Sequence, residues 1–209
     1  MDSVVKNNQV TVVGVISSEA EFNHEAYGED FYTACLSIPR TSGYKDKIPI
    51  TISDRMCKVK ELQVGQPIAV YGQFRSFNRH GDDRNQLVLS VFAQEMELLN
   101  GSSKHSDEND IFLNGFICKE PVYRKTPRGR EIAQLIVAVH RVHGKSDYIP
   151  CICWGRNARF ASALEVGSHV KLHGRIQSRE YVKRLSATET ETRMAYEVSV
   201  SKIEFRGEN

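Results

Sequence analysis

The chain has 209 residues, of which 40% are hydrophobic and 26% charged, with a net charge of +2. This composition is typical of a globular protein of one or two domains and excludes a disordered tail protein, a collagen-like repeat and a coiled coil. No apolar run approaches the roughly 20 residues of a membrane-spanning helix. The N-terminal MDSVVKNNQV lacks the apolar core of a signal peptide, and five cysteines occur without a CxxC spacing. These features predict a cytoplasmic protein without a disulfide framework.

The first half of the chain has the pattern of five strands and one helix. Alternating polarity and a high content of Val, Ile, Phe and Tyr predict strands over 10–17, 31–39, 48–52, 68–75 and 87–98. A polar hairpin follows the first strand, and a long loop precedes the last. A helix is predicted over 54–62, between the third and fourth strands.

The second half gives the same order of elements, with strands over 111–118, 132–141, 148–154, 170–178 and 196–205 and a helix over 157–164. The stretch NGSSKHSDEN at 100–109 separates the halves and holds no apolar residue, which predicts a linker. We therefore expect one unit over 1–100, a linker over 101–108 and a second unit over 109–209.

The two units are copies of one sequence. Ten residues of the first recur 101 positions later: Gly14, Ile16, Glu19, Gly28, Arg40, Gly43, Asp46, Ile48, Pro49 and Arg55 match Gly115, Ile117, Glu120, Gly129, Arg141, Gly144, Asp147, Ile149, Pro150 and Arg156. After one insertion the spacing is 102, where Val64, Gly65, Gly72 and Ser76 match Val166, Gly167, Gly174 and Ser178. The last strand recurs at 107. Such agreement indicates a tandem duplication.

Five strands with one helix between the third and fourth is the order of an OB-fold, a small Greek-key barrel that binds oligonucleotides or oligosaccharides. We therefore predict an all-β chain made of two five-stranded OB-folds, each with one short helix.

Charge is divided unequally between the units. Residues 1–108 carry 11 Lys and Arg against 15 Asp and Glu, a balance of −4, whereas residues 109–209 carry 17 against 11, a balance of +6. Ordinary surface variation is one explanation. The other is that the second unit meets a polyanion and the first meets it weakly or not at all.

The positions of the basic residues favour the polyanion. In an OB-fold the first and last hairpin loops border the ligand groove, and both are rich in Arg here. Residues predicted to contact a phosphate backbone are Arg124, Lys125, Arg128 and Arg130 in the first hairpin, Arg141 and Lys145 around the next loop, Arg156 at the helix, Lys171 and Arg175 on the fourth strand, and Arg179 and Lys183 in the last long loop. Phosphate contacts supply affinity that does not depend on base sequence.

The third strand shows how the units differ. In KIPITIS, at 47–53, the residues Ile48, Ile50 and Ile52 share one face, which identifies the core side of the strand. In YIPCICW, at 148–154, the matching core positions are Ile149, Cys151 and Cys153, and the outward face becomes Tyr148, Pro150, Ile152 and Trp154. The second unit thus keeps the core and replaces a polar outer face with an aromatic one.

Exposed aromatic rings framed by basic loops are typical of surfaces on which unpaired bases stack. Tyr148 and Trp154 would lie roughly 20 Å apart, a distance that an extended single strand covers in a few nucleotides. The following strand agrees, because Val170, Leu172 and Ile176 take the inward parity while Lys171, His173 and Arg175 face out. The alternative is that both aromatic rings pack beneath a loop or in a subunit interface.

No catalytic arrangement stands out. Cys151 and Cys153 share the core face, so buried thiols are favoured over a metal pair. The seven histidines lack ligand spacing, and ETETR at 189–193 is a solvated loop. No phosphate-binding glycine loop or nucleophile elbow is present. We expect no enzyme activity and no cofactor.

Several motifs of the second unit occur together in a known family. They are the N-x-x-x-L-x-G of Asn109, Leu113 and Gly115, the pair Glu120 and Pro121 followed by Tyr123 and Arg124, the apolar run from Gly129 to Val139, DYIPCICWG at 147–155, LEVGSHVKLHGRIQSREY at 164–181 and YEV at 196–198. Over nearly all of 109–205 the chain resembles the bacterial single-stranded DNA-binding protein family, and the whole chain is similar to its two-module clostridial members.

The resemblance implies base stacking on Tyr148, Trp154 and, in the last hairpin, Tyr181. It also implies binding of single-stranded DNA without strong sequence preference, in DNA replication, repair and recombination, close to the nucleoid, by assemblies that offer four OB-folds. Two chains would then pair.

Two departures from the family change this expectation. Family members usually end in an acidic, aromatic-tipped tail that recruits other enzymes, whereas this sequence ends at SKIEFRGEN, so we expect no recruitment through such a tail. The first unit has Lys47, Ser53 and Arg79 near the stacking positions, and its own Phe74 and Phe77 are core or interface candidates. We expect it to be mainly a pairing or interaction module.

Two other functions remain open. The chain could be an OB-fold protein-interaction module, of the kind found in primosomes, with weak nucleic-acid binding. It could also be an accessory protein that binds RNA or tRNA, because a sequence does not reveal contacts to the 2′-hydroxyl.

Overall fold

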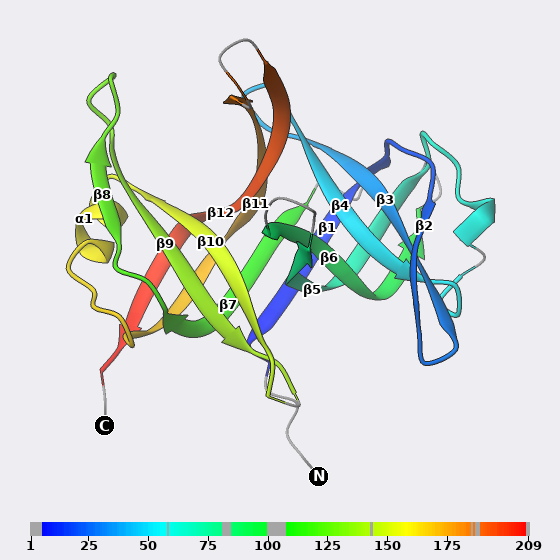
Figure 1. The fold of residues 1–209 in the computed structure, drawn as a ribbon, viewed down its shortest axis with the longest axis horizontal. Helices are drawn as coiled ribbons and strands as arrows, with labels where there is room; N and C mark the ends of the chain where they lie inside the picture. Colours follow the sequence, from blue (N-terminus) through cyan, green and yellow to red (C-terminus); the bar gives the residue numbers. More distant parts are fainter. Residues whose placement is uncertain are drawn as a thin grey trace.

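The computed structural model describes residues 6–57, 59–80, 85–99, 108–142, 144–184, 186 and 189–207, and they form an almost entirely β structure (Figure 1). The strands of the first unit are β1 Asn8–Ile16, β2 Glu21–Ala26, β3 Glu29–Pro39, β4 Lys45–Ser53, β5 Pro67–His80 and β6 Asn85–Leu98, with the 3-10 helix η1 Val59–Glu61. The second unit has β7 Asn109–Ile117, β8 Val122–Lys125, β9 Glu131–His140, β10 Ser146–Trp154, β11 His169–Arg184 and β12 Thr190–Arg206, with the helix α1 Arg156–Ala161.

Each unit closes into a barrel. In the first, β1 pairs with both β3 and β5, and a short parallel contact between β4 and β6 completes the ring. The second repeats this with β7, β9 and β11 and the parallel contact of β10 with β12. The closed order β1-β3-β4-β6-β5 is that of an OB-fold, so the predicted tandem OB-fold is confirmed.

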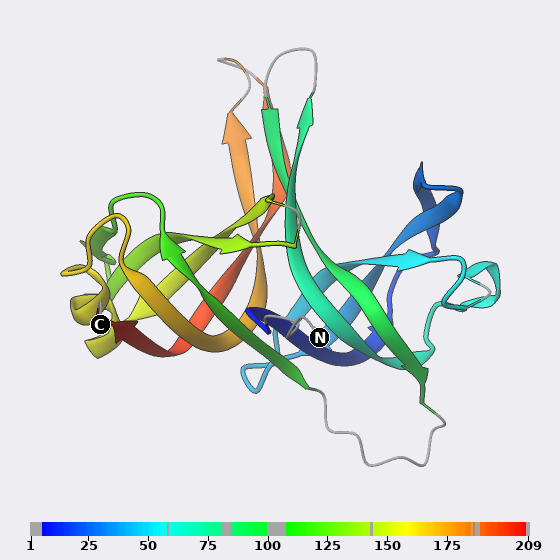
Figure 2. The same ribbon diagram turned by 90° about the horizontal axis from the view of Figure 1, so that it is seen from below.

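Two local predictions were wrong. The last long loop is mostly strand, because β11 and β12 continue as a ladder as far as the pair Arg184 and Thr190. Figure 2 shows this hairpin and the β5–β6 hairpin extending beyond the barrels. The helix of the first unit is only the three-residue 3-10 turn η1. In the second unit, α1 buries Ala158 and Ala161, two strong helix formers small enough to lie against the barrel.

The polar hairpins contain strands that the sequence did not predict. β2 and β8 extend β3 and β9 outward at opposite ends of the molecule (Figure 1). The five predicted strands of each unit lie within three residues of those observed, except that β5 and β11 end, and β12 begins, five or six residues farther into their hairpins. Residues 101–107 of the predicted linker lie outside the described part of the chain.

The core follows the predicted alternation. Ile48, Ile50 and Ile52 in β4 are fully buried, as are Ile149 and Cys153 in β10. In β11 the same holds for the inward set Val170, Leu172 and Ile176. The two units therefore bury alternate residues of their strands in the same way, and this alternation identifies the inward and outward faces of β4, β10 and β11.

The units are joined by the first strand of each. β1 and β7 pair antiparallel, with Val10 opposite Ile111, so that one hydrogen-bonded sheet runs through both barrels. Asn8 donates from Nδ2 to the Phe74 carbonyl and accepts from the Phe74 N–H, and Asn109 makes the same two bonds with Ile176. In the β1–β7 pair Asn8 lies opposite Leu113 and its equivalent Asn109 lies opposite Val12, so the joint has approximate twofold symmetry.

A second pair of contacts lies beside this joint, and we call each an interunit clasp. In one, Arg141 is ion-paired with the buried Asp147 and donates to the Ser76 carbonyl (2.9 Å), while the Ser76 N–H donates to Asp147 (2.6 Å). In the other, Arg40, Asp46 and Ser178 repeat the arrangement, with bonds of 3.1 Å and 2.6 Å. All six residues belong to the set that recurs between the units.

We expect Asp147→Asn to lower the free energy of unfolding by on the order of 3 kcal/mol, because Arg141 and the Ser76 N–H would lose a buried carboxylate. Urea titration followed by circular dichroism measures this change. Asp110→Asn, at an exposed position of β7, is the control and should change stability by less than about 0.5 kcal/mol. Equal effects of the two substitutions would contradict the role of the clasp.

Candidate nucleic-acid interface

The outer face of β10 carries the two aromatic residues that the sequence singled out. Tyr148 is 49% exposed and Trp154 is 39% exposed. Ile152 lies between them on the same face, but it is only 5% exposed, contrary to its expected outward position. It lies opposite Gln134 of β9 and Ser199 of β12, so strands flank it on both sides. The face thus offers two separate rings rather than a continuous aromatic strip.

Trp154 is held against the neighbouring strand. Its indole N–H donates to Ser199 Oγ at 3.3 Å. Ser199 lies directly opposite Arg175 in the β11–β12 ladder, and opposite residues of an antiparallel pair point to the same side. Trp154, Ser199 and Arg175 therefore share one outer surface.

This surface continues along the β11–β12 hairpin. Residues two apart share a face, so Arg179, Tyr181 and Lys183 extend the row that Arg175 begins. Tyr181 is 37% exposed, and the Arg179 guanidinium lies 5.9 Å from its ring centroid. Arg179 Nε is also 3.7 Å from the carboxylate of Glu197, so its charge is partly balanced. These residues lie on a paired strand and not in the loop predicted for them.

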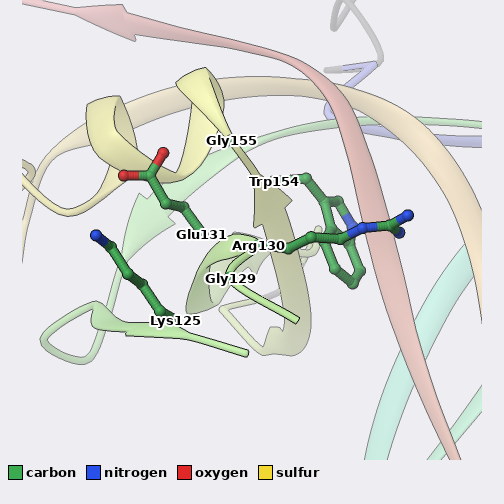
Figure 3. A pocket seen from close by; sticks show the side chains of 6 residues that line it. All are labelled: Lys125, Gly129, Arg130, Glu131, Trp154 and Gly155. Carbon is green, nitrogen blue, oxygen red and sulfur yellow. The ribbon is translucent and has the colours of Figure 1, made fainter. Parts of the chain in front are cut away.

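A hollow of about 490 Å³ opens beside Trp154, lined by Lys125, Gly129, Arg130, Glu131, Trp154 and Gly155. Figure 3 shows the side chains of Lys125 and Glu131 on one side of it and those of Arg130 and Trp154 on the other. Glu131 accepts from the Tyr123 hydroxyl at 2.7 Å and pairs with Arg159 at 3.1 Å. Within the described part of the chain, neither Lys125 nor Arg130 is in an ion pair. The hollow is therefore a cationic site with one aromatic wall.

The basic residues of the β8–β9 hairpin are all exposed: Arg124, Lys125, Arg128 and Arg130. The turn itself is ordered, because Thr126 accepts the Arg130 N–H on its hydroxyl and donates its own N–H to the Arg130 carbonyl. Hydrogen bonding to Glu131 raises the pKa of the Tyr123 hydroxyl. Within the described residues, none of the four cations of this hairpin is in an ion pair.

The remaining predicted phosphate contacts do not form one patch. Lys145 and Arg156 are exposed. Lys171 lies where β11 pairs with β7, opposite Glu204 and Asn114, and so is separated from the β10 face. Arg141 differs most, because its guanidinium is bound to Asp147 and to the carbonyl of Ser76 in the interunit clasp. Sequence reasoning missed this role, although the recurrence of both residues was the available signal.

The matching face of the first unit is closed by its own side chains. Ser53, at the position of Trp154, is buried and donates to Glu29. Phe92 takes the place of Ser199, and the Arg75 guanidinium covers its ring at 3.8 Å. Phe92 also contacts Phe31, with centroids 5.7 Å apart. The sequence did not single out Phe92, although the spacing of 107 between the last strands relates it to Ser199.

The other aromatic candidates of the first unit have different environments. Phe74 is fully buried in the core, whereas Phe77 on the extended part of β5 is exposed. Lys47 is exposed, and the side chain of Arg79 lies outside the described part of the structure.

The cysteine pair lies in the core. Burial raises the pKa of Cys153 to about 12 and that of Cys151 well above its usual range, so both remain protonated thiols at neutral pH. Among the described residues, no group of three His, Cys, Asp or Glu side chains is placed to hold a metal ion. No helix in that part of the chain is long and apolar enough to cross a membrane.

Comparison with known proteins gives one family. Residues 108–206 match the single-strand binding protein family. The chain is 35% identical over 80 residues to single-stranded DNA-binding protein A of Bacillus subtilis, covering 35% of this chain and 46% of that protein. It is also 35% identical over 92 residues to single-stranded DNA-binding protein 2 of Listeria innocua, covering 39% and 58%. The chain thus spans about half the length of the curated relatives it matches.

The solved structures agree on the fold of both units. The crystal structure of wild-type single-stranded DNA binding protein from Thermus aquaticus superposes with a TM-score of 0.74, covering 97% of this chain and 94% of that chain at 20% sequence identity. At this identity the likeness concerns the fold alone, and it extends over the complete tandem arrangement.

Proposed function

Through residues 108–206 this chain belongs to the single-strand binding protein family, and from that premise we propose that its second unit binds single-stranded DNA. Bases stack on Tyr148, Trp154 and Tyr181. The observation that carries the proposal is the position of Trp154, half-exposed between the cationic hollow and Arg175. Base stacking contributes about 1–3 kcal/mol per base and tolerates any base, so binding is largely independent of sequence.

The DNA backbone is contacted by the exposed or half-exposed cations on and around this face: Arg124, Lys125, Arg128, Arg130, Lys145, Arg156, Arg175, Arg179 and Lys183. Lys171 lies farther along β11 and would be reached only by a longer strand. We assign Arg141 to the interunit clasp instead of to DNA, because its Nε and Nη2 groups are bound to Asp147 and to the Ser76 carbonyl and its charge is balanced by that carboxylate.

The protein acts without catalysis and without a cofactor, in replication, repair and recombination of DNA in the cytoplasm. The two proposed units have different functions. The basic unit 109–209 holds the strand, and the acidic unit 1–100 is an interaction module, joined to it by the linker 101–108. The closed outer face of the first unit, with Arg75 over Phe92, supports this division.

Two chains are proposed to pair through the outer face of β1 and β7, giving four OB-folds. Val15 and Phe116 hold equivalent positions in the two units, and both are more than a third exposed there. Val13, Ala69 and Leu99 form a second apolar cluster beside them. A second copy, related by a separate twofold axis that passes through this face, would cover both sites.

The chain has a single tryptophan, so its fluorescence reports on Trp154 alone. We expect oligo-dT to quench this fluorescence, with binding that weakens as salt rises, and duplex DNA to leave it unchanged. Trp154→Ala should weaken binding about tenfold or more in an anisotropy titration, whereas Trp154→Phe, which retains a stacking ring, should lose less. An unresponsive Trp154 together with no binding by anisotropy would favour the protein-interaction module.

Phosphate contacts are tested by a pair of equivalent residues. Arg156→Gln should reduce the slope of log affinity against log salt by about 0.7, the value for one phosphate contact on a single strand. Arg55→Gln is the matched control, because Arg55 is the equivalent exposed arginine of the first unit and pairs with Glu29. It should leave the slope unchanged. Equal losses would place DNA on both units.

Pairing of chains is tested by sedimentation equilibrium. The wild type should give twice the chain mass of 23.7 kDa, and Phe116→Lys should give the monomer, because a charge would enter an apolar interface. Val166→Lys, at an exposed turn before β11, is the control and should remain paired. A wild type that sediments as a monomer would exclude the paired assembly.

A further inference from the structure

We propose that the first unit completes the single-stranded DNA site of the second, with Ser76 as a positioning residue that holds Tyr148. This inference rests on the proposed function, since it assigns a task to a residue that touches no DNA. It also gives the first unit an indirect part in binding, through Tyr148, in addition to interaction.

Three polar groups of Ser76, a residue of the first unit, form hydrogen bonds with residues of the second unit. Its Oγ accepts a hydrogen bond from the Tyr148 N–H at 2.8 Å. Its own N–H donates to Asp147 at 2.6 Å, and its carbonyl accepts from Arg141 at 2.9 Å. One residue of β5 thus anchors the start of β10 at two successive positions.

The hydrogen bond to Tyr148 lies at an otherwise open strand edge. β9 pairs with one side of β10 along its whole length, with Tyr148 opposite Ala138. On the other side, β12 reaches β10 only at Cys151 and Ile152. The Tyr148 N–H therefore lies beyond the β12 contact, and Ser76 Oγ takes the place of a strand partner. Holding this backbone group holds the Cα–Cβ direction of the stacking ring.

A ring already held in place loses less conformational freedom when a base stacks on it. Without Ser76, the first residues of β10 would be tied only to β9, and Tyr148 would sample more orientations before binding. The expected result is weaker binding through Tyr148, with no change in the number of phosphate contacts.

The molecule contains its own control. Ser178 makes the same contacts in the opposite direction, accepting from the Lys47 N–H at 2.9 Å and donating its own N–H to Asp46 at 2.6 Å. Lys47 occupies the position equivalent to Tyr148 but carries no ring. The two serines therefore share a structural role, and only Ser76 supports a stacking residue.

The experiment measures oligo-dT affinity, its salt slope and the free energy of unfolding for Ser76→Ala, Ser178→Ala, Tyr148→Ala and the double variant Ser76→Ala with Tyr148→Ala. We expect the two serine variants to lose similar stability. Ser76→Ala should weaken binding by about three- to tenfold, as expected for one lost hydrogen bond, with an unchanged salt slope. Ser178→Ala should stay within about twofold of the wild type. In the Tyr148→Ala background, Ser76→Ala should cause no further loss.

Two results would overturn the inference: equal losses of affinity for both serine variants, or an effect of Ser76→Ala that persists without the Tyr148 ring. Either would mean that Ser76 only stabilises the fold. Failure of the proposed function gives different results. Either the wild type does not bind oligo-dT, or Tyr148→Ala binds it as well as the wild type does. Both results would contradict the proposed DNA site and not only the role of Ser76. If Ser76→Ala does not fold, Ser76→Cys keeps the shape of the side chain, replaces the hydroxyl with a larger and weakly accepting thiol, and is expected to give the same ranking.

Discussion

The arrangement of this molecule depends on two buried carboxylates at the joint between its units. Asp46 and Asp147 are almost completely removed from water, and a charge in that position is tolerated only when donors surround it. Each aspartate is satisfied by an arginine of its own unit and a serine N–H of the other. The arginine pairs the charge within each unit, while the serine N–H and carbonyl groups that complete both sets come from the other unit, so the observed orientation of the barrels, with β1 paired to β7, satisfies both sets at once.

This constraint explains which residues the duplication retained. The first core residue of the third strand (Ile48 and Ile149), the glycines of the barrels and the members of both clasps recur, because each fits a tightly packed or hydrogen-bonded place, and the other core positions of that strand stay apolar as Ile or Cys. Outward positions were free to change. Lys47 and Ser53 of one unit correspond to Tyr148 and Trp154 of the other, and the basic β8–β9 hairpin corresponds to the acidic β2–β3 hairpin at the opposite end of the molecule (Figure 1).

The two outer faces have become different kinds of surface. In the second unit an aromatic ring lies open beside cations that form no ion pair within the described part of the chain, which suits a ligand with stacked bases and phosphates. In the first unit the aromatic position has moved to the neighbouring strand, where Arg75 covers Phe92 and Phe31 contacts its ring. A cation that already lies on a ring competes with any base for that ring. The joint nevertheless brings Ser76 of the first unit within hydrogen-bond distance of Asp147, Arg141 and the Tyr148 N–H of the second.

The sequence by itself determined the duplication, the barrel order, the core parity of each strand and the exposure of Tyr148 and Trp154, because alternation and repeat spacing are local properties of the chain. Only the tertiary structure decided the use of Arg141, whose partner Ser76 lies 65 residues away in the other unit. It also decided that Ile152 is buried despite its outward parity, that the last long loop is a paired hairpin, and that the first unit forms η1 instead of a helix. Each of these features depends on contacts between residues that lie far apart in the sequence, on different strands or in different units. The local pattern of polar and apolar residues does not specify such contacts.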